Sequence, residues 1–119
     1  MNGEKWKNLK VWQLADQLAL DIYKATKNFP KDELYGITSQ IPRAALSIPT
    51  NIVEGYSRKG DKELTRFVNI SLGSLAETKY LLKFARRLEL LTEKDYEELS
   101  IGYEELDRKL WKFYEAVRS

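Results

Sequence analysis

The sequence predicts an all-α protein, an antiparallel up-down-up-down four-helix bundle that forms a single domain over residues 1–119. Apolar residues recur at spacings of three and four in four segments, which is the pattern of an amphipathic helix. No segment keeps the alternation of apolar and polar residues that is typical of a strand. The connections between the segments are short, and short connections make consecutive helices antiparallel neighbours.

The first helix is predicted over residues 9–27. Its apolar positions are separated alternately by four and three residues, and they are Val11, Ala15, Leu18, Ile22 and Ala25. The stretch NFPKDE ends this helix, because Pro30 cannot continue it and also restricts the backbone of Phe29.

The second helix is predicted over residues 32–56 and contains Pro42 and Pro49. Each proline removes a backbone hydrogen bond and clashes with the carbonyl group one turn earlier, at a cost of about 3 kcal/mol inside a helix. Three outcomes are open. The helix bends around its neighbours, it kinks and frees carbonyl groups near Thr38 and Ala45 for a ligand or partner, or it divides into two shorter helices.

This second helix is apolar over more than half of its circumference. The apolar side chains are those of Ile37, Ile41, Ala44, Ala45, Leu46, Ile48, Ile52 and Val53. A surface helix of a lone bundle needs an apolar stripe of only about 100°. We therefore expect a second buried face, which means that the chain associates with copies of itself.

The remaining side of the second helix is polar. Antiparallel packing through the following short loop would place Ser47 near the level of Ser71 on the third helix. We expect an internal network of hydrogen bonds here, because buried polar groups satisfy one another. Its predicted members are Ser47, Asn51, Glu54 and Ser71. A ligand or nucleic-acid site built from the same residues is the alternative.

The third helix is predicted over residues 61–89, with Asp61 as its N-cap after Gly55 and the loop SRKG. Its buried face consists of Leu64, Val68, Ser71, Leu75, Thr78, Leu82 and Ala85. The fourth helix begins after Thr92, an N-cap with Asp95 three residues later, as in a capping box. Its spacing is the most regular of the four, over Tyr96, Leu99, Tyr103, Leu106, Leu110, Phe113 and Val117.

The chain contains no cysteine and no histidine. This removes disulfides, thiolate nucleophiles, the commonest general base and almost every transition-metal site. For an enzyme, the candidate is a carboxylate pair, Glu54 and Glu77, that could hold a hard cation such as Mg²⁺. No phosphate-binding loop or nucleophile motif supports catalysis. The sequence therefore predicts a protein that is not an enzyme and has no cofactor or metal.

The N-terminal stretch MNGEKWKNLK lacks the apolar core of a signal peptide, and no apolar run approaches transmembrane length. We expect a cytoplasmic protein with no membrane partner. The net charge is +2, made of +3 in residues 1–60 and −1 in residues 61–119.

Four motifs carry a resemblance to a known family. They are LKVWQLA (9–15), FP followed by E-x-YG (29–36), SIPTNIVEG (47–55) and GSLAE (73–77). Together they resemble the small four-helix-bundle proteins encoded by intervening sequences in bacterial 23S rRNA genes. In that family two consecutive arginines typically stand where this chain has Pro42 and Arg43. Because Pro42 replaces the first arginine, a phosphate contact by an arginine pair is less expected here.

The resemblance implies a left-handed bundle that assembles as an oligomeric ring, a homopentamer. It also implies similarity to the accessory proteins of diversity-generating retroelements, which are basic pentameric bundles that bind nucleic acid and a reverse transcriptase. On this basis we expect the partners to be further copies of the chain, RNA or DNA, and a nucleic-acid-processing protein.

Cations that lie near aromatic residues in the sequence favour nucleic-acid binding, because cations neutralise phosphates and aromatic rings stack on bases. The candidates are Lys5, Lys7, Arg58, Lys59, Lys62, Arg86 and Arg87. The simpler interpretation is a set of solvated helix ends, where Arg86 and Arg87 favour a C-terminus in any case.

We therefore predict a non-enzymatic oligomeric adaptor that associates with nucleic acid. The alternative is a protein–protein interaction scaffold that does not bind nucleic acid. It is favoured by acidic residues of the fourth helix, which would repel phosphates: Glu93, Asp95, Glu97, Glu98, Glu104, Glu105 and Asp107.

Overall fold

The computed structural model describes residues 2–30 and 36–118, and all regular structure in them is helical. The elements are a short 3₁₀ helix η1 (Asn2–Asn8), followed by α1 (Lys10–Thr26), α2 (Ile37–Ser57), α3 (Asp61–Arg87) and α4 (Glu93–Arg118). The prediction of an all-helical chain with four long helices is confirmed for these residues. The predicted start of the second helix at residue 32 lies outside them.

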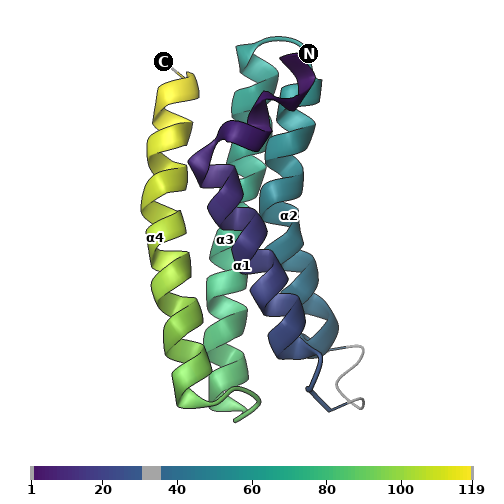
Figure 1. Cartoon of the computed structure of the whole chain (residues 1–119), viewed down its shortest axis with the longest axis vertical. Coiled ribbons are helices and arrows are strands. Elements are labelled where there is room, and N and C mark those ends of the chain that lie inside the picture. The colour runs from purple at the N-terminus through teal and green to yellow at the C-terminus, as the bar shows by residue number, and fades with distance from the viewer. Residues whose placement is uncertain (1, 31–35, 119) are drawn as a thin grey trace.

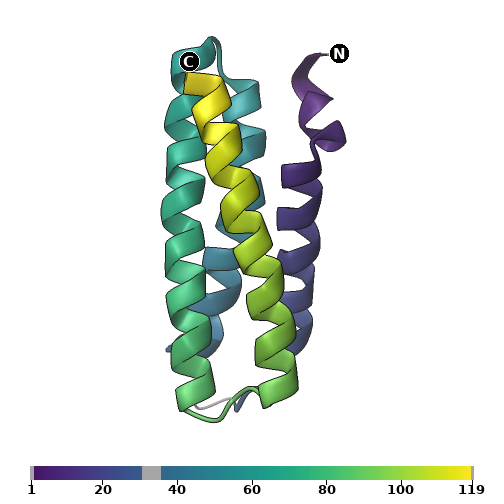
Figure 2. The same ribbon diagram turned by 90° about the vertical axis from the view of Figure 1, so that its left-hand side faces the viewer.

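The four α-helices lie side by side along the long axis of the molecule, whose Cα trace measures 43 × 24 × 20 Å. In Figure 1 the chain passes down α1, up α2, down α3 and up α4. α1 packs against α2 and α4, and α3 packs against the same two helices. Figure 2 shows α4 between α3 and α1 when the molecule is turned. The α1–α2 pair and the α3–α4 pair therefore form opposite sides of the molecule.

The core consists of the apolar faces that the spacing predicts. The largest side chains that are fully buried belong to Tyr103, Ile22, Ile41, Ile48, Ile52, Leu75, Leu106 and Leu110. Two polar residues, Ser71 and Thr78, have no exposed surface at all.

The third helix ends at Arg87 rather than residue 89, because Glu89 takes a left-handed backbone conformation with φ of 61°.

α2 runs without interruption through both prolines. Pro49 is buried and Pro42 is half-buried, so both rings contribute to packing. The division into two shorter helices is therefore contradicted.

Most of the apolar surface of α2 is covered within this one chain. Six of its apolar residues are buried, namely Ile37, Ile41, Ala44, Ala45, Ile48 and Ile52. The element η1, which the sequence did not predict, packs against both α2 and α1. Leu46 remains 44% exposed and Val53 is half-buried. The self-association that we expected from α2 thus stays a prediction, on a smaller exposed apolar surface than the sequence suggested.

Candidate nucleic-acid interface

A set of hydrogen bonds joins α2 to α3 at the middle of the bundle. The hydroxyl of Ser47 lies 2.7 Å from that of Ser74, and Asn51 Nδ2 donates to both the carbonyl and the hydroxyl of Ser47, at 2.8 and 2.9 Å. One turn away, Ser71 Oγ donates to the carbonyl oxygen of Ile48 at 2.8 Å. Small hydroxyl side chains on both helices allow this close approach. The partner of Ser47 is therefore Ser74, one turn along α3 from Ser71.

Glu54 lies outside this set of hydrogen bonds. Its carboxylate accepts a hydrogen bond from Arg58 Nε at 3.1 Å, and the hydroxyl of Ser57 lies 3.4 Å from the same oxygen. Glu54 thus belongs with the charged residues at the end of α2, where it partly neutralises Arg58, one of the predicted nucleic-acid contacts.

Cations gather around the turn between α2 and α3. The guanidinium groups of Arg58 and Arg66 both lie over the ring of Phe67, at 5.3 and 4.4 Å from its centroid. A hydrogen bond from Arg66, helped by the charges of Arg58 and Lys62, holds the pKa of the Glu63 carboxyl below its usual range. The direction of this shift is that expected of a carboxylate with cations close beside it.

Two further segments reach the same end. The C-terminal end of α4 meets the start of α3, where Thr65 Oγ1 donates to the carbonyl of Val117 at 3.4 Å and Lys62 and Arg118 line one hollow. The helix η1, which packs against α2, lies at the same end of the bundle as the α2–α3 turn (Figure 1).

The element η1, which includes Lys5 and Lys7, is anchored at this end by Trp6. The ring of Trp6 packs on that of Trp12, with centroids 4.6 Å apart, and Lys7 pairs with Glu4 at 2.7 Å.

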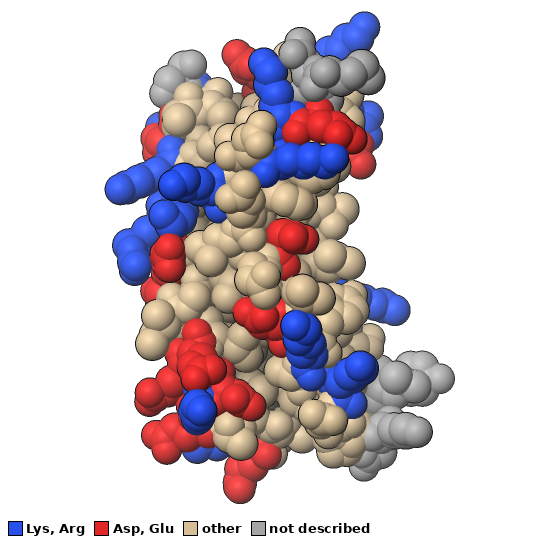
Figure 3. Space-filling view, viewed as in Figure 1, with Lys and Arg blue, Asp and Glu red and all other residues tan. Residues whose placement is uncertain are grey.

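We call this region the basic end, and define it as residues 4–10, 54–66 and 107–118. Together the three segments contain eleven Lys or Arg and six Asp or Glu, a net charge of +5 by count. Because the whole chain carries +2, the remaining residues sum to −3. Many of the lysines and arginines in Figure 3 lie in the upper part of the surface, with some acidic residues among them, whereas acidic residues gather at the lower end of α4.

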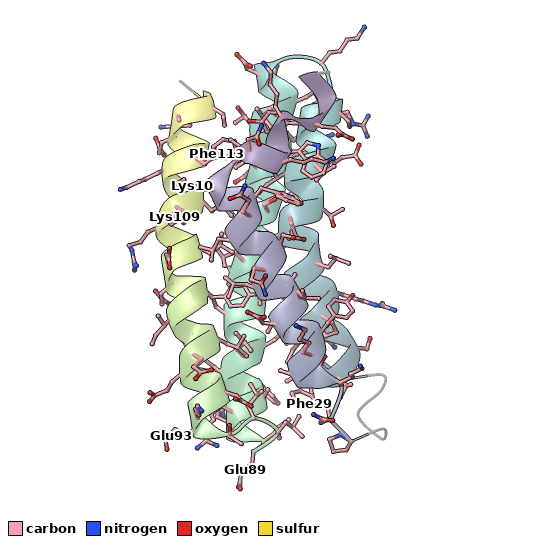
Figure 4. The ribbon with its side chains drawn as sticks, in the orientation of Figure 1. Lys10, Phe29, Glu89, Glu93, Lys109 and Phe113 are labelled. Atoms are coloured by element: carbon pink, nitrogen blue, oxygen red, sulfur yellow. The ribbon has the colours of Figure 1, made fainter. Side chains whose placement is uncertain are left out.

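The fourth helix itself changes sign along its length. Residues 93–105 contain six acidic residues and one basic residue, whereas residues 106–118 contain four basic and two acidic residues. Figure 4 shows this polarity through Lys109 in the upper half of α4 and Glu93 at its lower end. Arg108, Lys109 and Lys112 line a shallow hollow together with Glu105. The sequence analysis overlooked these cations, although the stretch DRKLWKFYEAVR carries the signal.

Of the seven predicted nucleic-acid contacts, five lie at the basic end: Lys5, Lys7, Arg58, Lys59 and Lys62. Arg86 and Arg87 lie at the other end of α3, which at 1.5 Å per residue is about 36 Å from Lys62. Arg86 Nη1 lies 3.4 Å from the carbonyl oxygen of Leu91, and Arg87 packs over Phe84. One compact contact cannot include both groups.

The described residues contain no group of three or more acidic side chains arranged to hold a metal ion. Within the same part of the chain, no helix combines the length and the apolar character needed to cross a lipid bilayer.

Comparison with known proteins identifies the family. The model of the 23S rRNA-intervening sequence protein family matches residues 7–112, which include nearly all of the four α-helices. The chain belongs to this family. The membership predicted from its motifs is thereby confirmed.

A solved structure resembles this intervening-sequence protein over most of its length. It is a protein of unknown function from the S23 ribosomal protein family of Bacteroides thetaiotaomicron, with a TM-score of 0.78 and 26% identity. The similarity covers 87% of this chain and 97% of that chain. A search of curated proteins gives no match.

Proposed function

We propose that this intervening-sequence protein is a non-enzymatic, oligomeric adaptor in the cytoplasm that associates with RNA or DNA through its basic end. The observation that carries the proposal is the concentration of charge, with a net +5 in three segments that meet at one end of a chain whose total is only +2. Cations so placed can neutralise several phosphates at once, and phosphate contacts supply most non-specific affinity.

Several cations of the basic end are exposed and have no ion pair among the described residues, so they are available to contact phosphates. Lys59 and Lys62 are exposed and form no ion pair with the described residues, and the same holds for Arg108 and Lys112. In contrast, Arg58, Arg66 and Lys7 already pair with carboxylates on their own helices. We therefore assign the largest part of the phosphate binding to the unpaired cations.

Self-association completes the proposal. In an antiparallel up-down-up-down bundle that assembles as a ring, a homopentamer, the basic ends of all subunits would lie on one rim. A polyanion that crossed this rim would meet the same cations in each subunit, so that modest affinities would combine. The resemblance to accessory proteins of diversity-generating retroelements supports a nucleic-acid-processing protein as a further partner.

The test is a salt titration of binding to a structured RNA and to a DNA duplex, with the assembly mass measured by light scattering in the same buffer. If four cations contact phosphates, the affinity falls about 150-fold between about 50 and about 200 mM salt, from a slope of about −0.9 per phosphate. Reversing Lys59 and Lys62 to Glu should lower both the affinity and the slope. Reversing Lys24 and Lys27 on α1, away from the basic end, is the matched control.

Equal effects of the two double variants, or no binding at about 50 mM salt, would refute the nucleic-acid function. A stable monomer at micromolar concentration would refute the ring. If nucleic acid does not bind, the acidic half of α4 makes a protein–protein interaction scaffold the better proposal, with a basic protein surface as its partner.

A further inference from the structure

Aromatic side chains remain exposed on the side of the molecule formed by α3 and α4. Tyr80 is 58% exposed and Trp111 is 50% exposed, although large aromatic rings are usually well buried. Each has a second ring beside it, since Phe84 lies 6.2 Å from Tyr80 and Tyr114 lies 5.8 Å from Trp111. The two exposed rings thus come from both helices, and each contacts a neighbouring ring on its own helix.

A groove of about 360 Å³ runs between the two helices at this point. Its floor is apolar, formed by Leu72, Leu75 and Ala76, and its walls include Tyr80 and Trp111. We call it the aromatic groove. It is partly open to solvent, so a flat ring can enter it.

The charges around the aromatic groove favour a polyanion. The two carboxylates beside it, Glu104 and Asp107, both pair with Lys79, at 2.8 and 2.7 Å. Hydrogen bonds from Lys79 to Asp107 and Glu104 raise the pKa of the lysine, so this group stays charged and cancels much of their negative charge.

The remaining cations around the groove are unpaired. On α3, Lys83 lines the groove and Arg87 packs over Phe84 one turn further along. On α4, Arg108 and Lys112 flank Trp111 in sequence and line the neighbouring hollow, and none of the four has an ion pair among the described residues. Of these four cations Lys83 lines the groove itself, Arg87 lies one turn beyond it along α3, and Arg108 and Lys112 lie close to Trp111 in the sequence of α4.

We propose that the aromatic groove binds single-stranded nucleic acid, with bases stacked on Tyr80 and Trp111 and phosphates held by these cations. The inference rests on the proposed function and names the class of nucleic acid. Aromatic rings above a cationic groove are how proteins bind single strands without reading sequence. A duplex keeps its bases stacked on one another, so their faces cannot reach the rings.

The groove also offers a path between Arg87 and the basic end, which are too far apart for one compact contact. Arg87 lies far from Lys62 along α3, but the groove leads from Lys83 and Arg87 past Tyr80 to Trp111 and the C-terminal half of α4. A strand in the groove therefore reaches the basic end while contacting Arg87.

The experiment measures fluorescence anisotropy of a labelled single strand and of a hairpin duplex of the same composition with the full chain, over a range of salt. Trp111→Ala should lower single-strand affinity roughly five- to 150-fold, the loss of one stacked base. The slope of affinity against salt should stay unchanged, because no phosphate contact is removed. Trp111→Phe, which keeps a ring, should restore much of the affinity, and duplex binding should change little.

The matched control is Ile101→Ala on the same helix, because Ile101 is 69% exposed but does not line the groove. It should leave both affinities unchanged. Lys83→Glu should instead reduce the slope itself, which separates the electrostatic contribution from the stacking contribution.

Three results would overturn the inference. Single-strand binding that is insensitive to both Trp111→Ala and Tyr80→Ala shows that the groove is not used, while the proposed function stands. If these variants change the assembly mass on light scattering but keep the single-strand affinity of the wild type, the groove forms contacts between copies of the chain. No binding of any nucleic acid at low salt removes the proposed function as well.

Discussion

The same substitution at two glycines should change stability in opposite directions. Gly55 is buried in the last turn of α2, within the basic end, and Gly73 is exposed in the middle of α3. A methyl group at Gly73 would meet no atom within 4 Å. A methyl group at Gly55 would lie 2.9 Å from Leu64 Cδ1 and 3.1 Å from Phe67 Cβ.

The magnitudes follow from these contacts. Replacing an exposed helical glycine by alanine stabilises a protein by about 0.5–1 kcal/mol, because glycine loses more backbone freedom on folding. The same gain applies at Gly55, but overpacking a filled contact costs about 1–3 kcal/mol. The end of the Leu64 side chain can rotate away, whereas Phe67 Cβ is fixed to the backbone, so α2 and α3 must separate slightly. We expect Gly55→Ala to lower the free energy of unfolding by about 1 kcal/mol, the difference between the middle values of the two contributions, and by no more than about 2.5 kcal/mol.

The assay is urea unfolding followed by circular dichroism, with all proteins at one protomer concentration, because self-association makes apparent stability concentration-dependent. Gly73→Ala is the internal control, and it should raise the unfolding free energy. Equal stabilities of the two variants would show that α2 and α3 do not approach as closely at Gly55 as described, and would refute the packing argument.

Two further predictions concern polar groups. Asn51→Leu should lower the unfolding free energy by about 1 kcal/mol, because it removes the hydrogen bonds to the carbonyl and hydroxyl of Ser47. An unchanged unfolding free energy in urea would contradict a structural role for Asn51. Tyr103→Phe should preserve or raise stability, since the hydroxyl is buried without a partner among the described residues. Burial, and secondarily the charge of Asp21, raises the pKa of Tyr103 above the ordinary tyrosine value of 10.0, so the folded state favours the neutral phenol. Wild-type stability should therefore fall as pH rises above that value, and Tyr103→Phe should lose less in the same alkaline titration.

The sequence predicts the four helices well because each carries a long apolar face at regular spacing. The buried residues of α4, for example Leu99, Tyr103, Leu106 and Leu110, are those that the spacing selects. The element η1 carries no such periodicity in seven residues, and its position depends on the packing of Trp6 against Trp12. A tertiary contact of this kind has no local signal.

The candidate site was predictable in composition but less so in arrangement. The register between α2 and α3 is close to the expected one, because Ser71 bonds to the carbonyl of Ile48, the residue after Ser47, but the hydroxyl partner of Ser47 is Ser74. The order of the helices already implied that Arg86 and Arg87 lie far from Lys62. What the sequence could not indicate is the exposure of Tyr80 and Trp111, because their spacing is that of ordinary helical residues.

The separation of charge along the bundle matters more for a polyanion than the net charge of +2. The acidic start of α4 and its basic end are separated by up to 25 residues, or about 37 Å at 1.5 Å per residue. Exposed charges are screened over about 8 Å at physiological salt, so a phosphate at the basic end hardly interacts with the acidic end. The local charge of +5 therefore governs binding there. The acidic end, equally isolated, remains free to contact a basic partner, so the two surfaces can act at the same time on opposite ends of one molecule.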